Sequence, residues 1–153
     1  MNRSEIMSRI RGKGNLSTER RMIEIFRKYR IIGWRRHQTI LKPGGGLRYV
    51  RPDFTFPRAR VLVLVDGCFW HACQSCYRRP KSNLEYWIPK MRANKKRDVL
   101  ATATLSSNGW RVFRIWEHCL KSSDEGRAKE LARQIAAVKA AVRRTRRTKS
   151  RVK

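Results

Sequence analysis

Four cysteines and a histidine form the most distinctive pattern in this sequence. Cys68, Cys73 and Cys76 lie close together, and Cys119 directly follows His118. Zinc is bound tetrahedrally by thiolates and imidazoles, and a Cys-x-x-Cys step with a distant His or Cys is typical of structural zinc sites. The pattern therefore predicts structural zinc, and buried inert thiols or a redox pair are the alternatives.

More side chains are available than a tetrahedral zinc ion requires. The six candidates are Cys68, His71, Cys73, Cys76, His118 and Cys119. Because zinc prefers thiolate, we expect the three clustered cysteines to bind it, with His118 or Cys119 as the fourth ligand. Judged from the residues alone, His71 is either a zinc ligand itself or a base that moves a proton to or from an attacking water.

Acidic residues around a short apolar run predict a second metal site. Asp53 lies in the segment before a run that ends at Val65, and Asp66 follows directly. Hairpin pairing would bring Asp53 near Asp66 and the Val65 backbone carbonyl. Such oxygens suit Mg²⁺, which in phosphodiester cleavage polarises the phosphate and positions hydroxide. The alternative is that Asp53, after a proline, is a turn residue, but Glu19 and His71 favour the metal site.

The charge of the chain indicates a polyanionic partner. Its 153 residues include 38 Lys plus Arg and 11 Asp plus Glu, a formal net charge of +27. Basic side chains that replace condensed counterions bind nucleic acid strongly, so nucleic acid is the first partner to consider. A ribosomal-type or merely solvated basic surface is the alternative.

The remaining composition favours one soluble domain. Hydrophobic residues make up 41% of the chain, enough for a single core. No apolar run approaches the roughly 18–20 residues that span a bilayer, and the first residues lack the apolar stretch of a signal peptide. We therefore expect a cytoplasmic protein without a membrane segment.

Hydrophobic periodicity predicts an α/β domain with a mixed sheet. The expected elements are a helix capped by Ser17 or Thr18 that ends near Gly33, strands over 34–41, 49–56 and 61–65, a helix over 83–107 closed by Asn108-Gly109, a strand over 110–116 and a last helix capped by 123–125. Pro52 indicates an edge or bulge, and the β-branched run 61–65 indicates a central strand. Residues 143–153 are basic and are expected to form a disordered tail.

Several short strings together resemble the very-short-patch repair (Vsr-type) DNA mismatch endonuclease family. They are Ser4 to Ile10, Glu19, Arg51-Pro52-Asp53-Phe54, Val65 to His71, Tyr86-Trp87 with Lys90, Asn94 and Arg97-Asp98, Gly109 to Val112, and Trp116-Glu117. The resemblance covers about residues 4–120. It implies a restriction-endonuclease-like mixed central sheet flanked by helices, with a structural zinc site. It also implies an enzyme that nicks double-stranded DNA 5′ to the thymine of a T:G mismatch left by deamination of 5-methylcytosine.

The resemblance also implies roles for the candidate residues. Asp53 would be the central magnesium ligand with the Val65 carbonyl, while His71 acts on the attacking water and Glu19 positions that water. Asp66 stands where an active-site histidine can occur in the family, so it would alter protonation of the leaving group or be a second metal ligand. For zinc, His118 matches the position of the fourth ligand, and Cys119 is the second choice.

The resemblance further implies wedges that open the DNA. Phe69 and Trp70 match aromatics that intercalate beside the mismatch, and Met7 matches a wedge from the minor-groove side. Without it, Phe69 and Trp70 would be core residues and Met7 an ordinary terminal residue. Lys90 and Asn94 are candidates for contacts to phosphate or base edges, although a solvated helix face has the same spacing.

These expectations define one preferred function and two alternatives. The preferred protein is a magnesium-dependent, zinc-stabilised DNA repair nickase, monomeric and bound to DNA in the bacterial nucleoid, with mismatch-repair proteins and a DNA polymerase acting downstream. Its parts would be a DNA-contacting segment (1–16), an endonuclease domain (17–142) and the basic tail (143–153). The alternatives are a sequence-directed or homing-type nicking endonuclease, and a zinc-containing nucleic-acid-binding module without activity.

Overall fold

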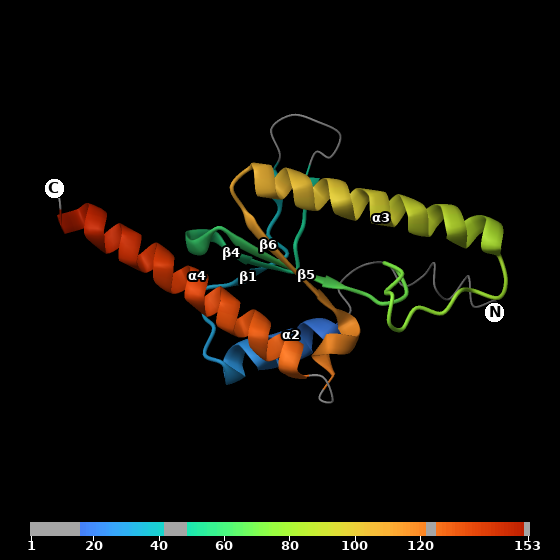
Figure 1. Cartoon of the computed structure of the whole chain (residues 1–153), viewed down its shortest axis with the longest axis horizontal. Helices are drawn as coiled ribbons and strands as arrows, with labels where there is room; N and C mark the ends of the chain where they lie inside the picture. Colours follow the sequence, from blue (N-terminus) through green and yellow to red (C-terminus); the bar gives the residue numbers. More distant parts are fainter. Residues whose placement is uncertain (1–15, 42–48, 122–124, 152–153) are drawn as a thin grey trace.

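A four-stranded mixed sheet lies at the centre of the protein, whose computed structural model describes residues 16–41, 49–121 and 125–151 (Figure 1). The strand order is β1-β4-β5-β6, with β1 Arg35–Arg36, β4 Phe54–Phe56, β5 Val61–Asp66 and β6 Arg111–Trp116. β4 pairs antiparallel with β1 and β5, whereas β5 and β6 are parallel. The mixed sheet and the central position of the β-branched strand are therefore confirmed.

The two strands expected over 34–41 and 49–56 are each broken in two. Ile40–Leu41 (β2) and Tyr49–Val50 (β3) form a separate two-stranded sheet, beyond the ends of β1 and β4. His37 follows β1 with a φ of 49°, which a strand cannot contain. Pro52 lies in the other break and lacks the amide that a continuous ladder needs. These two breaks bring His37 and Asp53 into irregular backbone.

Helices cover both faces of the sheet (Figure 1). The helices α2 Leu16–Lys28 and α4 Glu125–Arg151 pack together on one face, and α3 Leu84–Ser107 lies on the other. Short 3₁₀ turns, η1 Pro57–Ala59 and η2 Glu117–Leu120, follow β4 and β6. No described helix combines the length and the apolar character needed to cross a membrane.

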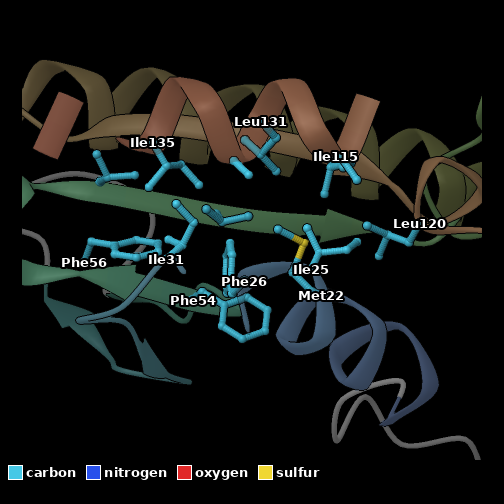
Figure 2. Packing of buried hydrophobic residues seen from close by; sticks show 14 of the residues in the cluster. Met22, Ile25, Phe26, Ile31, Phe54, Phe56, Ile115, Leu120, Leu131 and Ile135 are labelled. Atoms are coloured by element: carbon cyan, nitrogen blue, oxygen red, sulfur yellow. The ribbon is translucent and has the colours of Figure 1, made fainter. Parts of the chain in front are cut away.

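The main core lies between β4, β5 and the α2–α4 pair (Figure 2). On α2, Met22, Ile25 and Phe26 are fully buried at the three- and four-residue spacing of one helix face. The ring of Phe26 meets those of Phe54 and Phe56 edge to face, at centroid distances of 5.1 and 5.5 Å. This packing holds the C-terminal half of α2 against β4.

Helix ends differ from the sequence prediction in two places. Helix α2 begins at Leu16, so Ser17 and Thr18 lie within it rather than at its cap. Helix α4 continues to Arg151, where a disordered basic tail was expected from residue 143. Arginine and lysine are good helix formers and neither Gly nor Pro interrupts the segment, so the helix extends without a core to pack on. The C-terminal end of α3 was predicted correctly, with Asn108 as cap and Gly109 at a φ of 76°.

Candidate functional site

Three cysteines and one histidine converge after β5. Cys68, Cys73, Cys76 and His118 each present one ligand atom, and these atoms all lie within 4.8 Å of one another. We call them the thiolate group. The three sulfurs lie 3.3, 3.6 and 3.5 Å from Nδ1 of His118 in chain order. Three thiols and an imidazole match the donor set and number of a structural zinc site.

The orientation of η2 determines whether His118 or Cys119 belongs to the thiolate group. His118 points to the sulfurs, whereas Cys119 is buried in the hydrophobic core. Adjacent residues of a tight helical turn point in different directions, so one pair cannot supply both ligands. Glu117, in the same turn, accepts a hydrogen bond from the Cys68 amide at 3.2 Å and ties the loop to β6.

The pKa values of two cysteines in this group are shifted in opposite directions. Hydrogen bonding with Cys68 raises the pKa of Cys76 to about 12. Burial raises the pKa of Cys73, but hydrogen bonds from the amides of Ser75 and Cys76 outweigh it, and the net pKa is lowered. Three sulfurs this close can all be deprotonated only with a cation among them, so a metal ion bound by this group would be held by thiolates.

A second convergence joins three distant segments. Glu19, His37 and Asp53 also present ligand atoms within 4.8 Å of one another. We call them the carboxylate group. His37 Nε2 lies 2.9 Å from Glu19 Oε1. The described part of the chain contains these two groups of potential metal ligands.

Each member of the carboxylate group is fixed by the fold. Glu19 lies one turn before Met22 on the buried face of α2 and is only 2% exposed. The His37 amide donates to the Asp53 carbonyl at 3.2 Å, and the positive φ of His37 turns the chain at that point. Asp53 Oδ2 accepts a hydrogen bond from the Val65 amide at 2.7 Å, which brings Asp53 to the carboxyl end of β5 as the hairpin predicts.

Two carboxylates in this confined space favour a cation. Burial raises the pKa of Asp53, the Val65 hydrogen bond lowers it, and the negative charge of Glu19 raises it further. Arg36 forms an ion pair with Glu19 Oε2. A divalent ion would offset the remaining repulsion, and the hard oxygen donors suit such an ion.

Asp66 is placed differently from the expectation of a second metal ligand. Both of its oxygens accept hydrogen bonds from Arg114 on β6, at 2.7 and 2.5 Å, and the structure does not bring it into the carboxylate group. Arg114 also pairs with Asp98 of α3 at 3.1 Å. Asp66 alternates along β5 with the core residues Val63 and Val65, so it points to the opposite face, where Arg114 and α3 lie.

His71 is held by the same ionic network. Its Nδ1 contacts Asp98 Oδ2, and its amide donates to the Gly67 carbonyl at 3.1 Å. Burial raises the pKa of Asp98, but His71 and Arg114 more than offset this, so the net pKa is lowered and Asp98 is a stable anion. With Nδ1 facing a carboxylate, Nε2 of His71 is the nitrogen left to exchange a proton.

Aromatic rings gather between the cysteine loop and the start of α3. Phe69 meets Trp70 and Trp87 edge to face at centroid distances of 5.4 and 5.2 Å. Lys90 lies over the ring of Trp70 at 5.9 Å, and the Asn94 amide donates to the Trp70 carbonyl at 3.2 Å. Lys90 and Asn94 therefore support the aromatic residues directly. Phe69 and Trp70 are partly exposed, and Met7 lies outside the described residues.

Four contributors to these sites escaped the sequence analysis. They are His37, Arg36, Asp98 in its contact with His71, and Arg114. His37 and Arg36 fell within an expected strand, where they resemble ordinary polar residues. Arg114 alternates with apolar residues on β6, which is equally typical of a solvent-facing position. Of the four, only Asp98 offered a signal, because it belongs to one of the strings that carry the resemblance.

The fold and the two ligand groups define an α/β protein with two candidate metal sites. A family model described as DNA mismatch endonuclease Vsr matches residues 1–78. This range contains the carboxylate group, His71 and the three clustered cysteines, and ends before His118. The chain belongs to the Vsr family, which confirms the resemblance seen in the sequence.

Individual relatives agree with this membership. The chain is 44% identical over 88 residues to the type II nicking enzyme V.NaeI of Lentzea aerocolonigenes, covering 57% of this chain and 52% of the relative. It is 34% identical over 100 residues to V.HpaIIP of Haemophilus parainfluenzae, with 59% and 71% covered. It is 35% identical over 77 residues to the DNA mismatch endonuclease Vsr of Escherichia coli, with 49% of each covered. The chain thus matches about half the length of V.NaeI and of Vsr.

Proposed function

We propose that this protein is a divalent-metal-dependent endonuclease that nicks double-stranded DNA at T:G mismatches, with a restriction-endonuclease-like fold. The observation that carries the proposal is the carboxylate group, in which Asp53 lies beside Val65 and faces Glu19 within the part of the chain that matches the family. The net charge of +27 suits a DNA substrate.

The carboxylate group would hold the catalytic ion. Asp53 and Glu19 would be its ligands, together with the Val65 carbonyl expected from the sequence. A divalent ion bound there supplies Lewis acidity to the scissile phosphate and a more acidic water. The Val65 amide and Arg36 hold one oxygen of each carboxylate, so both groups are oriented before any substrate arrives.

His71 would act as the base for the attacking water. Asp98 binds Nδ1 and thereby fixes the ring and its tautomer, so Nε2 accepts the proton. Arg114 ties Asp98 to Asp66 and completes the support of the ring. In this proposal Asp66 is a positioning residue that acts through Arg114. It is not the second metal ligand that the sequence analysis considered.

The thiolate group would bind structural zinc and hold the loop that presents the aromatic wedges. Phe69 and Trp70 follow Cys68 directly, so a rigid Cys68 fixes where these rings stand. Insertion of apolar rings unstacks a base step at a cost of a few kcal/mol, and a mismatch lowers that cost. Lys90, Asn94 and Met7 would assist as further DNA contacts.

The T:G substrate is tested by cleavage of end-labelled duplexes that differ in one base. Duplexes with a T:G mismatch in several flanking contexts are compared with the same duplexes carrying C:G, in Mg²⁺ and in Mn²⁺. The proposal predicts a nick 5′ to the mismatched thymine and intact C:G duplexes. Binding of both duplexes without cleavage in either metal would favour the zinc-containing binding module instead.

A second candidate function is a sequence-directed nicking endonuclease, which the names of two relatives support. Two of the relatives reported above carry the name type II nicking enzyme. Equal cleavage of T:G and C:G duplexes at one sequence would select this candidate. The domain boundaries, the monomeric state, the cytoplasmic location and the downstream repair proteins stay predictions from the sequence.

A further inference from the structure

The carboxylate group contains a nitrogen donor that the proposed magnesium chemistry does not use. His37 Nε2 lies 2.9 Å from Glu19 Oε1 and shares the ligand cluster with Asp53. Neither the resemblance nor the sequence pattern assigned this histidine a role. Its ring is 32% exposed, whereas the Glu19 side chain is 2% exposed, so the histidine forms the outer side of the group.

The backbone conformation at His37 fixes the position of its ring beside Glu19. Its φ of 49° belongs to the left-handed region, which costs free energy in residues with a side chain. Two further contacts fix the turn: the His37 amide donates to the Asp53 carbonyl at 3.2 Å, and Arg51 Nε donates to the His37 carbonyl at 3.1 Å. The ring is therefore oriented toward Glu19 by the same backbone that carries Asp53.

The remaining contact of the Glu19 carboxylate lies inside the group. Arg36 pairs with Oε2 of Glu19, and the Val65 amide donates to Oδ2 of Asp53. Oε1 of Glu19 is hydrogen-bonded to Nε2 of His37, and a bound cation would replace this contact while Asp53 lies within reach of the same ion. One oxygen from each acid and one imidazole nitrogen could thus converge on a single cation.

We propose that His37 Nε2 is a ligand of the divalent ion at the carboxylate group, and that it makes the site select a first-row transition-metal ion such as Mn²⁺ over Mg²⁺. Magnesium strongly prefers oxygen donors and octahedral geometry, while imidazole strengthens binding of transition-metal dications. The inference rests on the proposed function for the presence of an ion at Asp53, and it names which ion the residues favour.

The test measures metal binding and not cleavage. Zinc-loaded protein is titrated with Mn²⁺ and with Mg²⁺, and pulsed electron paramagnetic resonance of bound Mn²⁺ records coupling to ¹⁴N. The chain has three histidines, and His118 belongs to the thiolate group, so assignment needs only two variants. His37→Gln should abolish the ¹⁴N coupling and reduce the preference for Mn²⁺ over Mg²⁺ by at least about tenfold. His71→Gln, the same substitution at the other histidine, should leave coupling and preference unchanged.

Folding is controlled separately. His37→Asn keeps a residue that tolerates the left-handed backbone and should lose the coupling as His37→Gln does. Zinc content and circular dichroism of both variants report whether the fold is retained. Bound Mn²⁺ without ¹⁴N coupling in the wild type, or coupling that persists in both His37 variants, would overturn the inference. If the protein nicks DNA but shows no ¹⁴N coupling from His37, the proposed function holds and the inference about His37 fails. If the coupling is present but the protein does not nick DNA, the inference holds and the proposed function fails.

Discussion

The two ligand groups of this protein are built in opposite ways. The thiolate group takes three of its four ligands from one short loop, and only His118 comes from a distant turn. The carboxylate group takes its members from α2, from the break after β1 and from the segment before β4. One group is largely fixed by local spacing, whereas the other exists only once the sheet and α2 have packed.

This difference separates folding from chemistry. A zinc ion held by the thiolate group would have no open position and would contribute to stability. An ion held by two carboxylates and one imidazole would be labile and would keep water ligands, which suits hydrolysis. Changes in the first group should therefore be read in the free energy of unfolding, and changes in the second in the rate of cleavage.

The largest effect should follow from loss of a thiolate ligand. Cys73→Ser should release the metal and lower the free energy of unfolding by several kcal/mol. That is a large part of the total, which is roughly 5–15 kcal/mol for a native domain. Zinc analysis and urea unfolding measure both. Cys119→Ala is the matched control, because this buried cysteine lies outside the group and its loss should keep the metal bound. A stable, metal-free Cys73→Ser protein would show that the group is not structural.

The next effect should appear in the chemistry alone. His71→Gln should reduce the rate of nicking by about 10²–10⁴-fold, the usual contribution of a general base, while zinc content and DNA affinity stay unchanged. Asp98→Asn should lose less, because it weakens only the contact that orients the ring. Single-turnover rates across pH distinguish the two roles. Wild-type rates in His71→Gln would remove this residue from the mechanism.

A smaller effect should follow from shortening α4. Residues 143–153 contain seven Lys or Arg and no acidic residue. The C-terminal part of α4 extends away from the sheet (Figure 1). Deletion of these residues should weaken DNA binding about tenfold at moderate salt. It should also reduce the slope of log affinity against log salt by ~0.9 for each DNA phosphate that the shortened protein no longer neutralises. An unchanged slope would mean that the basic helix does not touch DNA.

The smallest effect concerns stability without the catalytic ion. Burial raises the pKa of Asp53 in the folded protein above its usual 3.8. The acid therefore stabilises the fold when protonated at low pH, and this contribution is lost as pH rises through the folded pKa. Asp53→Asn should accordingly be more stable than wild type at neutral pH, on the order of 1 kcal/mol, with the difference vanishing toward about pH 4.

Urea unfolding of zinc-loaded protein without other divalent ions measures this difference. Addition of Mn²⁺ should reverse the order, because only the wild type can then gain stability from a bound ion. A variant that is less stable at all pH values would indicate that Asp53 is chiefly a structural acceptor for the Val65 amide.

The sequence predicts well wherever neighbours along the chain decide the structure. The run 61–65 has the length and β-branched content of a central strand, and Asn108-Gly109 ends α3 as expected. The cysteine spacing brings three members of the thiolate group into one loop, and the hairpin places Asp53 beside Val65. In each case the pattern and the structure depend on the same few residues.

The remaining features depend on contacts between distant residues. His37 joins the carboxylate group through a left-handed turn, which no residue pattern around it specifies. Asp66 is removed from that group by Arg114, and this follows from the parallel pairing of β6 with β5. The choice of His118 over Cys119 needs the orientation of η2. Such placements become visible only in the folded chain.

The central claim is that the carboxylate group cleaves DNA, and one comparison tests it directly. Wild type and Asp53→Asn, both zinc-loaded and folded, are given an end-labelled T:G duplex under single-turnover conditions, first without a further divalent ion and then with Mn²⁺. We predict that only wild type with the added ion nicks the DNA, and that Asp53→Asn binds the duplex at least as tightly, because one negative charge is removed. Nicking by Asp53→Asn at the wild-type rate would contradict the account.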